Sequence, residues 1–306
     1  MKYAGVITRV PAKINLQLSV GPLADDGFHE VATVFQAVSI YDDVTIKAGA
    51  KGAGISVSVM GTTSNGVPAD ASNLAYRAAE LMIRRCKLSR DLSISIKKEI
   101  PVAGGMAGGS ADAAATIVGI DALFDLGLSR DELEHIAAEL GSDVPFGISG
   151  GIALGRGRGD QLTPVLSKGT YHWVLATSSQ GLSTPAVYAE CDRLREGLQI
   201  ARPQISDAMM QALRAGDATA LGSAMTNDLQ SAACSLRPAL RLVLDVGKDY
   251  GALGGIVSGS GPTIAFLVDD EEKSLDLTVA LSSSGVVAGV MRASGPVHGA
   301  RVIETL

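Results

Sequence analysis

The 306-residue sequence is poor in cysteine, and its few cysteines form no recognisable pattern. Cys86, Cys191 and Cys234 lie far apart, and none of them belongs to a CxxC pair. This spacing argues against a zinc site and against a disulfide framework. We therefore expect a protein of a reducing compartment.

Long hydrophobic runs are missing as well. Glycine, serine or charged residues interrupt each apolar stretch before it reaches the ~18 residues that a membrane-spanning helix needs. The first segment, MKYAGVITRVPAKINL, carries charges at Lys2, Arg9 and Lys13 and lacks the continuous apolar region of a signal peptide. These features predict a cytoplasmic protein that does not bind a membrane.

The chain has no excess of basic residues. It contains 26 Lys and Arg against 32 Asp and Glu, which gives a net charge of -6. Without an overall positive field the protein is a poor candidate for binding nucleic acid, so any phosphate has to be held by local geometry. Hydrophobic residues make up 46% of the chain and charged residues 19%, a composition that predicts a chain folded throughout.

Familiar nucleotide-binding signatures are also absent. The sequence contains neither GxxxxGK[ST] nor GxGxxG, and it lacks the H-R-D and D-F-G motifs of protein kinases. A different glycine-rich loop, GGMAGGS at 104–110, lies between a predicted strand and a predicted helix, with Ser110 as the expected N-cap. Small residues let a backbone approach a ligand, and free N–H groups at a helix start attract phosphate. The loop therefore indicates a phosphate site, with a plain flexible turn as the alternative.

Length and hydrophobic patterns predict a two-domain α/β protein with a cleft between the domains. We expect short strands within residues 1–60, a helix over 72–86 capped by Ser72 or Asn73, and a helix over 270–284.

Capping signals place two further helices. Ser129 and Glu132 form an S-x-x-E capping box, and the helix that they begin is followed by a tight loop, SDVPF. Thr184 and Pro185 are the expected N-cap and first residue of a helix that reaches Leu198. The glycine-dense stretch 147–159 has no role that its pattern indicates.

Several segments carry a resemblance that covers nearly the whole chain. PAKINLQLSV at 11–20, PVAGGMAGGSADAA at 101–114 and VSGSGPTIAF at 257–266 resemble the three motifs of the GHMP small-molecule kinases. Within that superfamily, DGFHEVATVFQAV at 26–38 and STPAVY at 183–188 resemble members whose acceptor carries a cytidine diphosphate group. The resemblance implies an ATP-dependent kinase that phosphorylates a hydroxyl group of such a small molecule.

The same resemblance implies an α+β fold and its domain structure. It predicts an N-terminal ribosomal-protein-S5-like β/α domain over residues 1–168 and a C-terminal ferredoxin-like α+β domain over residues 169–306, with the active site in the cleft between them.

Carried over by motif, the catalytic residues of the family fall on Lys13 of PAKINL and Asp143 of GSDVPF. A carboxylate beside an alcohol can accept its proton as the oxygen attacks phosphorus, and an adjacent ammonium stabilises the negative charge. Outside these motifs, Lys13 would be an ordinary solvated strand residue and Asp143 an ordinary loop residue.

The resemblance also implies an ATP site. Asn73 is expected near the adenine, and Ser110 near the phosphates and a Mg²⁺ ion that is held largely by ATP and water. The predicted ATP-binding stretch consists of Pro101, Val102, Ala103, Gly104, Gly105, Met106, Ala107, Gly108, Gly109, Ser110 and Ala111.

For the acceptor, the family places a cytosine between two aromatic rings, which match Phe28 and Tyr188. His29 is expected to read the edge of the base, and Asn15 and Thr184 to add polar contacts. Taken alone, His29 would be an ordinary loop histidine.

Three alternatives stay open. Gly147, Ser149 and Gly151 satisfy the G-x-S-x-G pattern of serine hydrolases, for which His172 or His298 would supply the histidine. A nucleotide-binding protein without turnover is the second alternative, although binding alone needs neither Lys13 nor Asp143. The third is a related kinase that acts on homoserine or on a mevalonate-type alcohol.

Overall fold

The computed structural model describes residues 3–88, 91–102 and 104–306. Within these residues, an eight-stranded sheet is built on two long antiparallel strands, β1 (Gly5–Leu23) and β2 (His29–Ala48). The central path of the sheet has the order β12-β1-β2-β4-β3, in which β3 is Ile55–Met60, β4 is Leu92–Lys97 and β12 is Arg301–Thr305. Strands β5 (Ile152–Arg156) and β6 (Gln161–Pro164) continue from β2, and β8 (Thr226–Asn227) pairs with β1.

The expectation of short strands within residues 1–60 is wrong for β1 and β2, because one long hairpin replaces them. Buried apolar side chains at Val10, Ala12, Ile14 and Leu16 alternate along β1 with the buried polar side chains of Lys13 and Asn15, because successive residues of a strand point to opposite faces of the sheet. A register shift between Pro11 and Ala12 lets the pairing with β2 continue past the proline.

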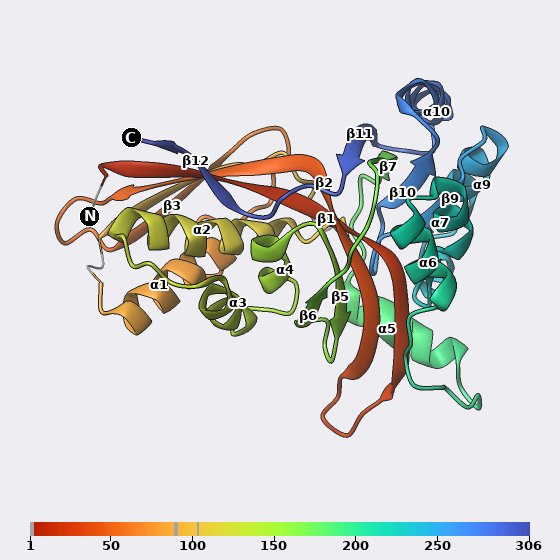
Figure 1. The fold of residues 1–306 in the computed structure, drawn as a ribbon, viewed down its shortest axis with the longest axis horizontal. Coiled ribbons are helices and arrows are strands. Elements are labelled where there is room, and N and C mark those ends of the chain that lie inside the picture. Colours follow the sequence, from red (N-terminus) through yellow and green to blue (C-terminus); the bar gives the residue numbers. More distant parts are fainter. Residues whose placement is uncertain (1–2, 89–90, 103) are drawn as a thin grey trace.

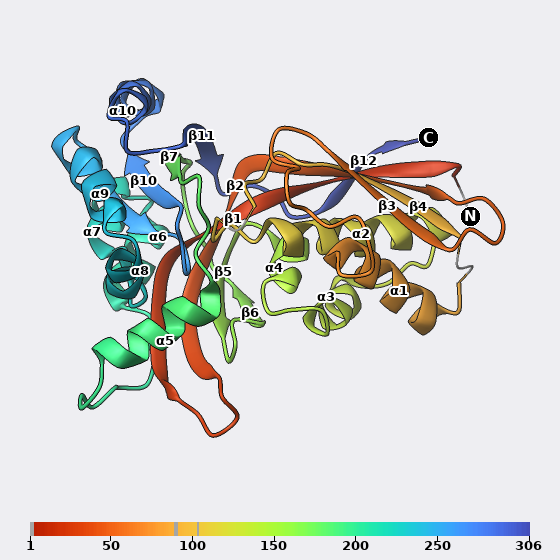
Figure 2. The same cartoon turned by 180° about the vertical axis from the view of Figure 1, so that it is seen from behind.

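Four helices lie on one side of this sheet, as Figures 1 and 2 show. They are α1 (Leu74–Cys86), α2 (Gly108–Phe124), α3 (Arg130–Ala138) and α4 (Val144–Ser149). The alanine-rich α2 lies close to the sheet, because a Cβ at Gly119 would be 2.4 Å from Ile46 Cδ1. This close packing fixes the start of α2 relative to β1 and β2.

A second sheet has the order β11-β7-β10-β9. Its strands are β7 (Tyr171–Thr177), β9 (Gly254–Val257), β10 (Ile264–Val268) and β11 (Gly289–Gly295). The helices gathered around it are α5 (Thr184–Leu194), α6 (Asp207–Ala215), α7 (Ala218–Ala224), α8 (Gln230–Leu236), α9 (Ala239–Asp249) and α10 (Glu271–Ser283) (Figures 1 and 2). Trp173 and Phe266 are fully buried at its centre. The two sheets with their helices confirm the expected α+β class.

The chain passes from the first sheet to the second between β6 and β7, which brackets the predicted boundary at residue 168. Two segments return to the first sheet, because β8 pairs with β1 in parallel and β12 pairs with β1 in antiparallel orientation. Division into domains 1–168 and 169–306 stays a prediction.

Local capping signals gave mixed results. Asn73 caps α1, and Ser129 with Glu132 forms the complete capping box of α3, so both predictions are confirmed. The helix expected from Thr184 to Leu198 ends at Leu194, and its N-cap is Ser183.

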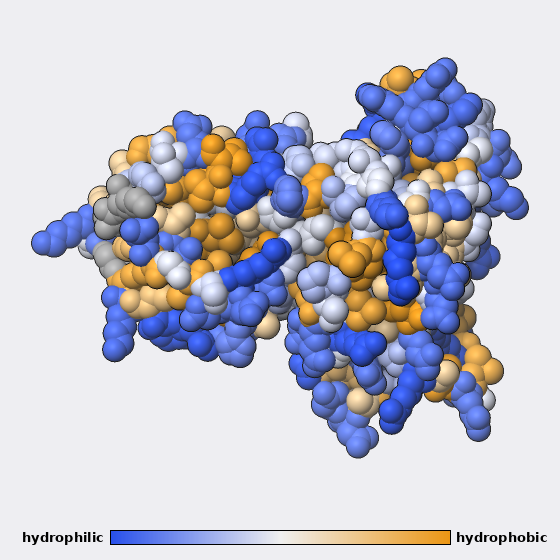
Figure 3. Space-filling model, viewed as in Figure 1, coloured by the Kyte–Doolittle hydropathy of each residue, from blue (hydrophilic) through white to orange (hydrophobic). Residues whose placement is uncertain are grey.

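In the described part of the chain, no helix is long and apolar enough to cross a membrane. In the view of Figure 3, hydrophilic side chains form most of the outline, and hydrophobic ones lie in patches among them.

Candidate active site

The glycine-rich loop joins β4 to α2 and is held by a distant turn. Gly105 has a φ of 76°, and a Cβ there would lie 2.1 Å from the carbonyl oxygen of Ser258. The Ser258 hydroxyl donates to the Gly105 carbonyl at 3.1 Å, and the Thr263 N–H donates to the Gly104 carbonyl at 3.2 Å. Glycine is therefore required for this close approach, and the turn at 258–263 fixes the path of the loop.

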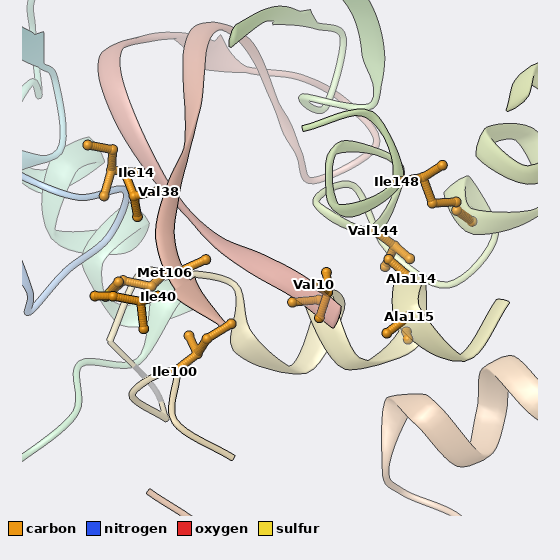
Figure 4. Packing of buried hydrophobic residues seen from close by; sticks show 14 of the residues in the cluster. Val10, Ile14, Val38, Ile40, Ile100, Met106, Ala114, Ala115, Val144 and Ile148 are labelled. Carbon is orange, nitrogen blue, oxygen red and sulfur yellow. The ribbon is translucent and has the colours of Figure 1, made fainter. Parts of the chain in front are cut away.

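A buried hydrophobic side chain, Met106, also holds the glycine-rich loop against the core. Met106 is fully buried and lies beside Ile40 and Ile100 (Figure 4). Its side chain leaves the backbone of the neighbouring glycines at the surface of a cavity.

The prediction that Ser110 caps α2 is wrong. The helix begins at Gly108, and its N-cap is Ala107 with a φ of 56°. The Ala107 carbonyl accepts from the Ala111 N–H at 2.9 Å, so Ser110 stands within the first turn. The open N–H groups of this turn and the positive end of the helix dipole make an anion site.

A cavity of about 470 Å³ lies at this helix start and collects most of the predicted site residues. Its lining includes Lys13, Asn15, Pro101, Gly104, Gly105, Ala107, Gly108, Gly109, Ser110, Asp143, Thr184 and Tyr188. Other predicted site residues line two neighbouring cavities. Phe28 and His29 line one of about 380 Å³, and Asn73 and Val102 line one of about 220 Å³. Met106 and Ala111 are buried, and Ala103 falls outside the described residues.

Lys13 and Asp143 face each other in the main cavity. Lys13 Nζ lies 3.8 Å from Asp143 Oδ2 and donates to Asn15 Oδ1 at 2.8 Å. Asn15 in turn donates to the Thr33 hydroxyl at 2.8 Å. The Lys13 side chain is only 8% exposed, against 36% for Asp143. A fixed ammonium thus stands beside a carboxylate that is open to a ligand.

Asp143 is positioned by a short helix where the sequence suggested a tight loop. Asp143 occupies the N-cap position of α4, and its side chain makes no capping hydrogen bond. Figure 4 shows Val144 of α4 beside Ala114 of α2. A Cβ at Gly147 would lie 2.7 Å from the Ala114 Cβ, so the two helices touch and α4 holds Asp143 at the cavity wall.

At the other end of the site, the His29 and Tyr188 rings lie 5.2 Å apart, tilted by 31°. His29 Nδ1 lies 2.9 Å from the Gly21 carbonyl, which can only accept, so Nδ1 carries the hydrogen. His29 Nε2 lies 3.3 Å from Asp192 Oδ2. Burial, with a smaller contribution from the charge of Asp143, raises the pKa of Tyr188 to about 12.

Phe28 does not face Tyr188 across a shared cavity. Its side chain is 51% exposed, and the Arg158 guanidinium lies 3.7 Å from the centre of its ring. Arg158 belongs to the glycine-dense stretch for which the sequence indicated no role, and it also lines the main cavity. Sequence reasoning missed this residue, because 130 positions separate it from Phe28.

Asn73 is nearly buried, and both ends of its amide are occupied. Its oxygen accepts from the Ala75 N–H at 2.8 Å, and its nitrogen donates to the Pro68 carbonyl at 2.7 Å. The structure places Asn73 behind the phosphate loop, in the cavity of about 220 Å³ that also borders Gly108 and Gly109.

A buried charged group that sequence reasoning missed ties the two ends of the phosphate loop together. Lys98 Nζ donates to Asp42 Oδ2 at 2.5 Å and to Asp112 Oδ2 at 2.7 Å. Asp42 also accepts from the N–H groups of Glu99 and Ile100. Burial raises the pKa of Asp112 well above its usual range. We name Lys98, Asp42 and Asp112 the loop triad.

The structure contradicts the serine hydrolase alternative. Ser149 is the last residue of α4, is followed by β5, and donates its hydroxyl hydrogen to Glu134. A hydrolase nucleophile stands on a sharp turn from a strand into a helix, which is the reverse order.

Comparison with known proteins agrees with this geometry. Residues 73–153 match the family described as the GHMP kinases N terminal domain, and residues 209–298 match the GHMP kinases C terminal family. A homoserine kinase from Cytophaga hutchinsonii has the same fold, with a TM-score of 0.76 over 99% of this chain and 98% of that one, at 19% identity. The chain is a GHMP kinase, an ATP-dependent small-molecule kinase.

More similar relatives show which family of GHMP kinases the chain belongs to. The chain is 52% identical to the 4-diphosphocytidyl-2-C-methyl-D-erythritol kinase of Rhodococcus jostii, over 98% of this chain and 95% of that protein. It is also 52% identical to the enzyme of that name from Nocardia farcinica, over 98% of this chain and 96% of the relative. A crystal structure of 4-(cytidine 5'-diphospho)-2C-methyl-D-erythritol kinase superposes with a TM-score of 0.77 at 29% identity, covering 94% of this chain and 98% of that one. The chain belongs to the family of 4-diphosphocytidyl-2-C-methyl-D-erythritol kinases, which confirms the resemblance seen in its motifs.

Proposed function

We propose that this kinase transfers the γ-phosphoryl group of ATP to the 2-hydroxyl of 4-diphosphocytidyl-2-C-methyl-D-erythritol, giving the 2-phosphate and ADP. This reaction belongs to the non-mevalonate route to isoprenoid precursors. The observation that carries the proposal is the Lys13–Asp143 pair, whose charged atoms lie 3.8 Å apart in one cavity with the phosphate loop. The relatives at 52% identity are named as kinases of the same acceptor.

In this proposal Asp143 is the general base. Its carboxylate takes the proton of the acceptor hydroxyl as that oxygen attacks the γ-phosphorus, and the bond from phosphorus to the ADP oxygen breaks. Lys13 stays charged beside it and stabilises the negative charge that develops on the transferred group. The hydrogen bond from Lys13 to Asn15 holds the ammonium in place.

The phosphates of ATP fit the start of α2. Backbone N–H groups of Gly108, Gly109 and Ser110 open the helix there, where the dipole favours negative charge. Mg²⁺ would neutralise part of the phosphate charge during the transfer. In the described residues, no group of three or more His, Cys, Asp or Glu residues forms a metal cluster. An ion held mainly by phosphate oxygens, water and the Ser110 hydroxyl suits this arrangement.

The cytidine end of the acceptor fits the region of His29, Tyr188 and Phe28. A neutral Tyr188 ring offers a stacking surface in the main cavity, and the exposed Phe28 ring offers a second one in the neighbouring cavity. The Thr184 hydroxyl lies 2.8 Å from that of Ser260, and both residues line the main cavity with Tyr188 and Asp143.

The test is ADP release from purified protein with Mg-ATP and one of three acceptors: 4-diphosphocytidyl-2-C-methyl-D-erythritol, homoserine or mevalonate. We expect release with the cytidine compound alone. Release with another acceptor would mean that the pocket around His29 and Tyr188 does not select a cytidine compound. No release with any of them would favour a nucleotide-binding protein without turnover.

A further inference from the structure

We propose that Arg158 binds the diphosphate of the acceptor and thereby selects acceptors that carry one. This inference rests on the proposed function, because it assumes that the acceptor spans from the aromatic pocket to Asp143. It assigns a role to the glycine-dense stretch 147–159.

The position of Arg158 is the first observation. Among the described residues, it alone lines both the main cavity with Lys13 and Asp143 and the neighbouring cavity with Phe28 and His29. An acceptor with its base at one end and its reacting hydroxyl at the other must place the linking diphosphate at the junction of these cavities. The junction is where the Arg158 guanidinium stands.

Charge is the second observation. The lining of the cavity beside Phe28 includes the carboxylates of Asp26, Glu30 and Asp160, so a diphosphate needs a cation there. The other cation of the main cavity, Lys13, already contacts Asn15 and Asp143. Arg158 is therefore the cation available to the linking phosphates, and its planar fork of N–H donors matches phosphate oxygens.

The contacts of Arg158 orient its guanidinium and leave hydrogen-bond donors free for a ligand. One guanidinium nitrogen donates to Asp26 Oδ2 at 3.1 Å, and the side chain is 51% exposed. Asp26 also accepts from the Phe28 N–H at 3.0 Å, which keeps the carboxylate beside the ring. An exposed ion pair of this kind is weak, so exchanging part of it for a diphosphate costs little.

The backbone around Arg158 is built to present it. Gly157 and Gly159 have φ values of 68° and 97°, which allow a tight turn on both sides of the arginine. The Gly157 carbonyl accepts from the Val31 N–H at 2.8 Å and anchors the turn to β2. The Arg158 N–H donates to Asp160 Oδ1 at 3.2 Å.

The experiment compares cytidine, CMP and CDP as inhibitors competing with the acceptor, in wild-type protein and in Arg158→Gln. Charge-assisted hydrogen bonds are worth about 10- to 100-fold in binding, so the preference for CDP over cytidine should fall by about that factor in the variant. Binding of cytidine should weaken much less than binding of CDP, and the KM for ATP should stay unchanged. Arg158→Lys should restore part of the preference, because it keeps the charge and loses the planar fork.

Arg292→Gln is the matched control, since Arg292 of β11 forms a surface ion pair with Glu271 of α10, away from both cavities. Equal weakening of cytidine and CDP in Arg158→Gln would overturn the inference and leave Arg158 as a support for the Phe28 turn. A raised KM for ATP with an unchanged CDP preference would also overturn it. If the wild type bound no cytidine compound and turned none over, the proposed function itself would fail.

Discussion

Replacing Lys98 with methionine should remove about 3–5 kcal/mol from the free energy of unfolding, because it breaks a buried ion pair and leaves a carboxylate without its cation. Lys98 is 2% exposed and Asp42 is fully buried, so water cannot take the place of the ammonium. Native domains are stable by roughly 5–15 kcal/mol. The loss would therefore be a large fraction of the total.

Asp112→Asn should behave very differently from Lys98→Met. Burial raises the pKa of Asp112 in the folded protein above its unfolded value, so at a pH between these two pKa values the folded state holds a proton that the unfolded state releases. The stability linked to this proton is present below the unfolded pKa and is lost as pH rises through the folded pKa. An asparagine mimics the protonated form. The variant should thus gain stability relative to the wild type as pH increases.

The assay is urea unfolding at several pH values from 5 to 9, with circular dichroism as the readout. Lys97→Met is the matched control, because Lys97 precedes Lys98 on the same strand end and is exposed. It should change the midpoint little. A loss below about 1 kcal/mol in Lys98→Met, the range of an exposed pair, would refute the reasoning about the loop triad.

Three further predictions concern the active site. Asp143→Asn should lower kcat at least ~100-fold with ATP binding retained, measured by ADP release and by calorimetric titration of ATP; unchanged turnover would remove Asp143 as the base. Phe28→Ala should raise the acceptor KM about 3- to 10-fold through lost stacking, whereas Phe28→Tyr should keep the wild-type KM. The same KM in Phe28→Ala as in Phe28→Tyr would exclude Phe28 from the pocket. Asn73→Ala should cost ~1 kcal/mol through loss of the α1 cap, read as a lower Tm, and an unchanged Tm would show that the cap is dispensable.

Local signals in the sequence predicted those features that depend on neighbouring residues. Asn73 and the Ser129–Glu132 pair cap their helices as expected, because a cap involves residues only two or three positions apart. The position of the glycine-rich loop between β4 and α2 follows from the same kind of local pattern.

Features that depend on distant residues escaped prediction. Lys98 meets Asp42 across 56 positions, and no periodicity marks either residue as buried. The register shift beside Pro11 depends on the partner strand, so the sequence alone suggested short strands within residues 1–60 in place of the long hairpin. The roles given to Lys13 and Asp143 came from the resemblance of motifs, since an isolated lysine or aspartate carries no local signal.

The pairing of β12 with β1 has a consequence for how the chain folds as it is synthesised. Arg301 lies beside Arg9, and Thr305 beside Val6, so nearly 300 residues must leave the ribosome before this pairing can form. Until then, the N–H and C=O groups along that edge of β1 remain open, and an open edge invites pairing with other chains. Contacts between segments so far apart in sequence also form slowly. Protection of nascent chains from aggregation should therefore matter most for this edge, late in synthesis.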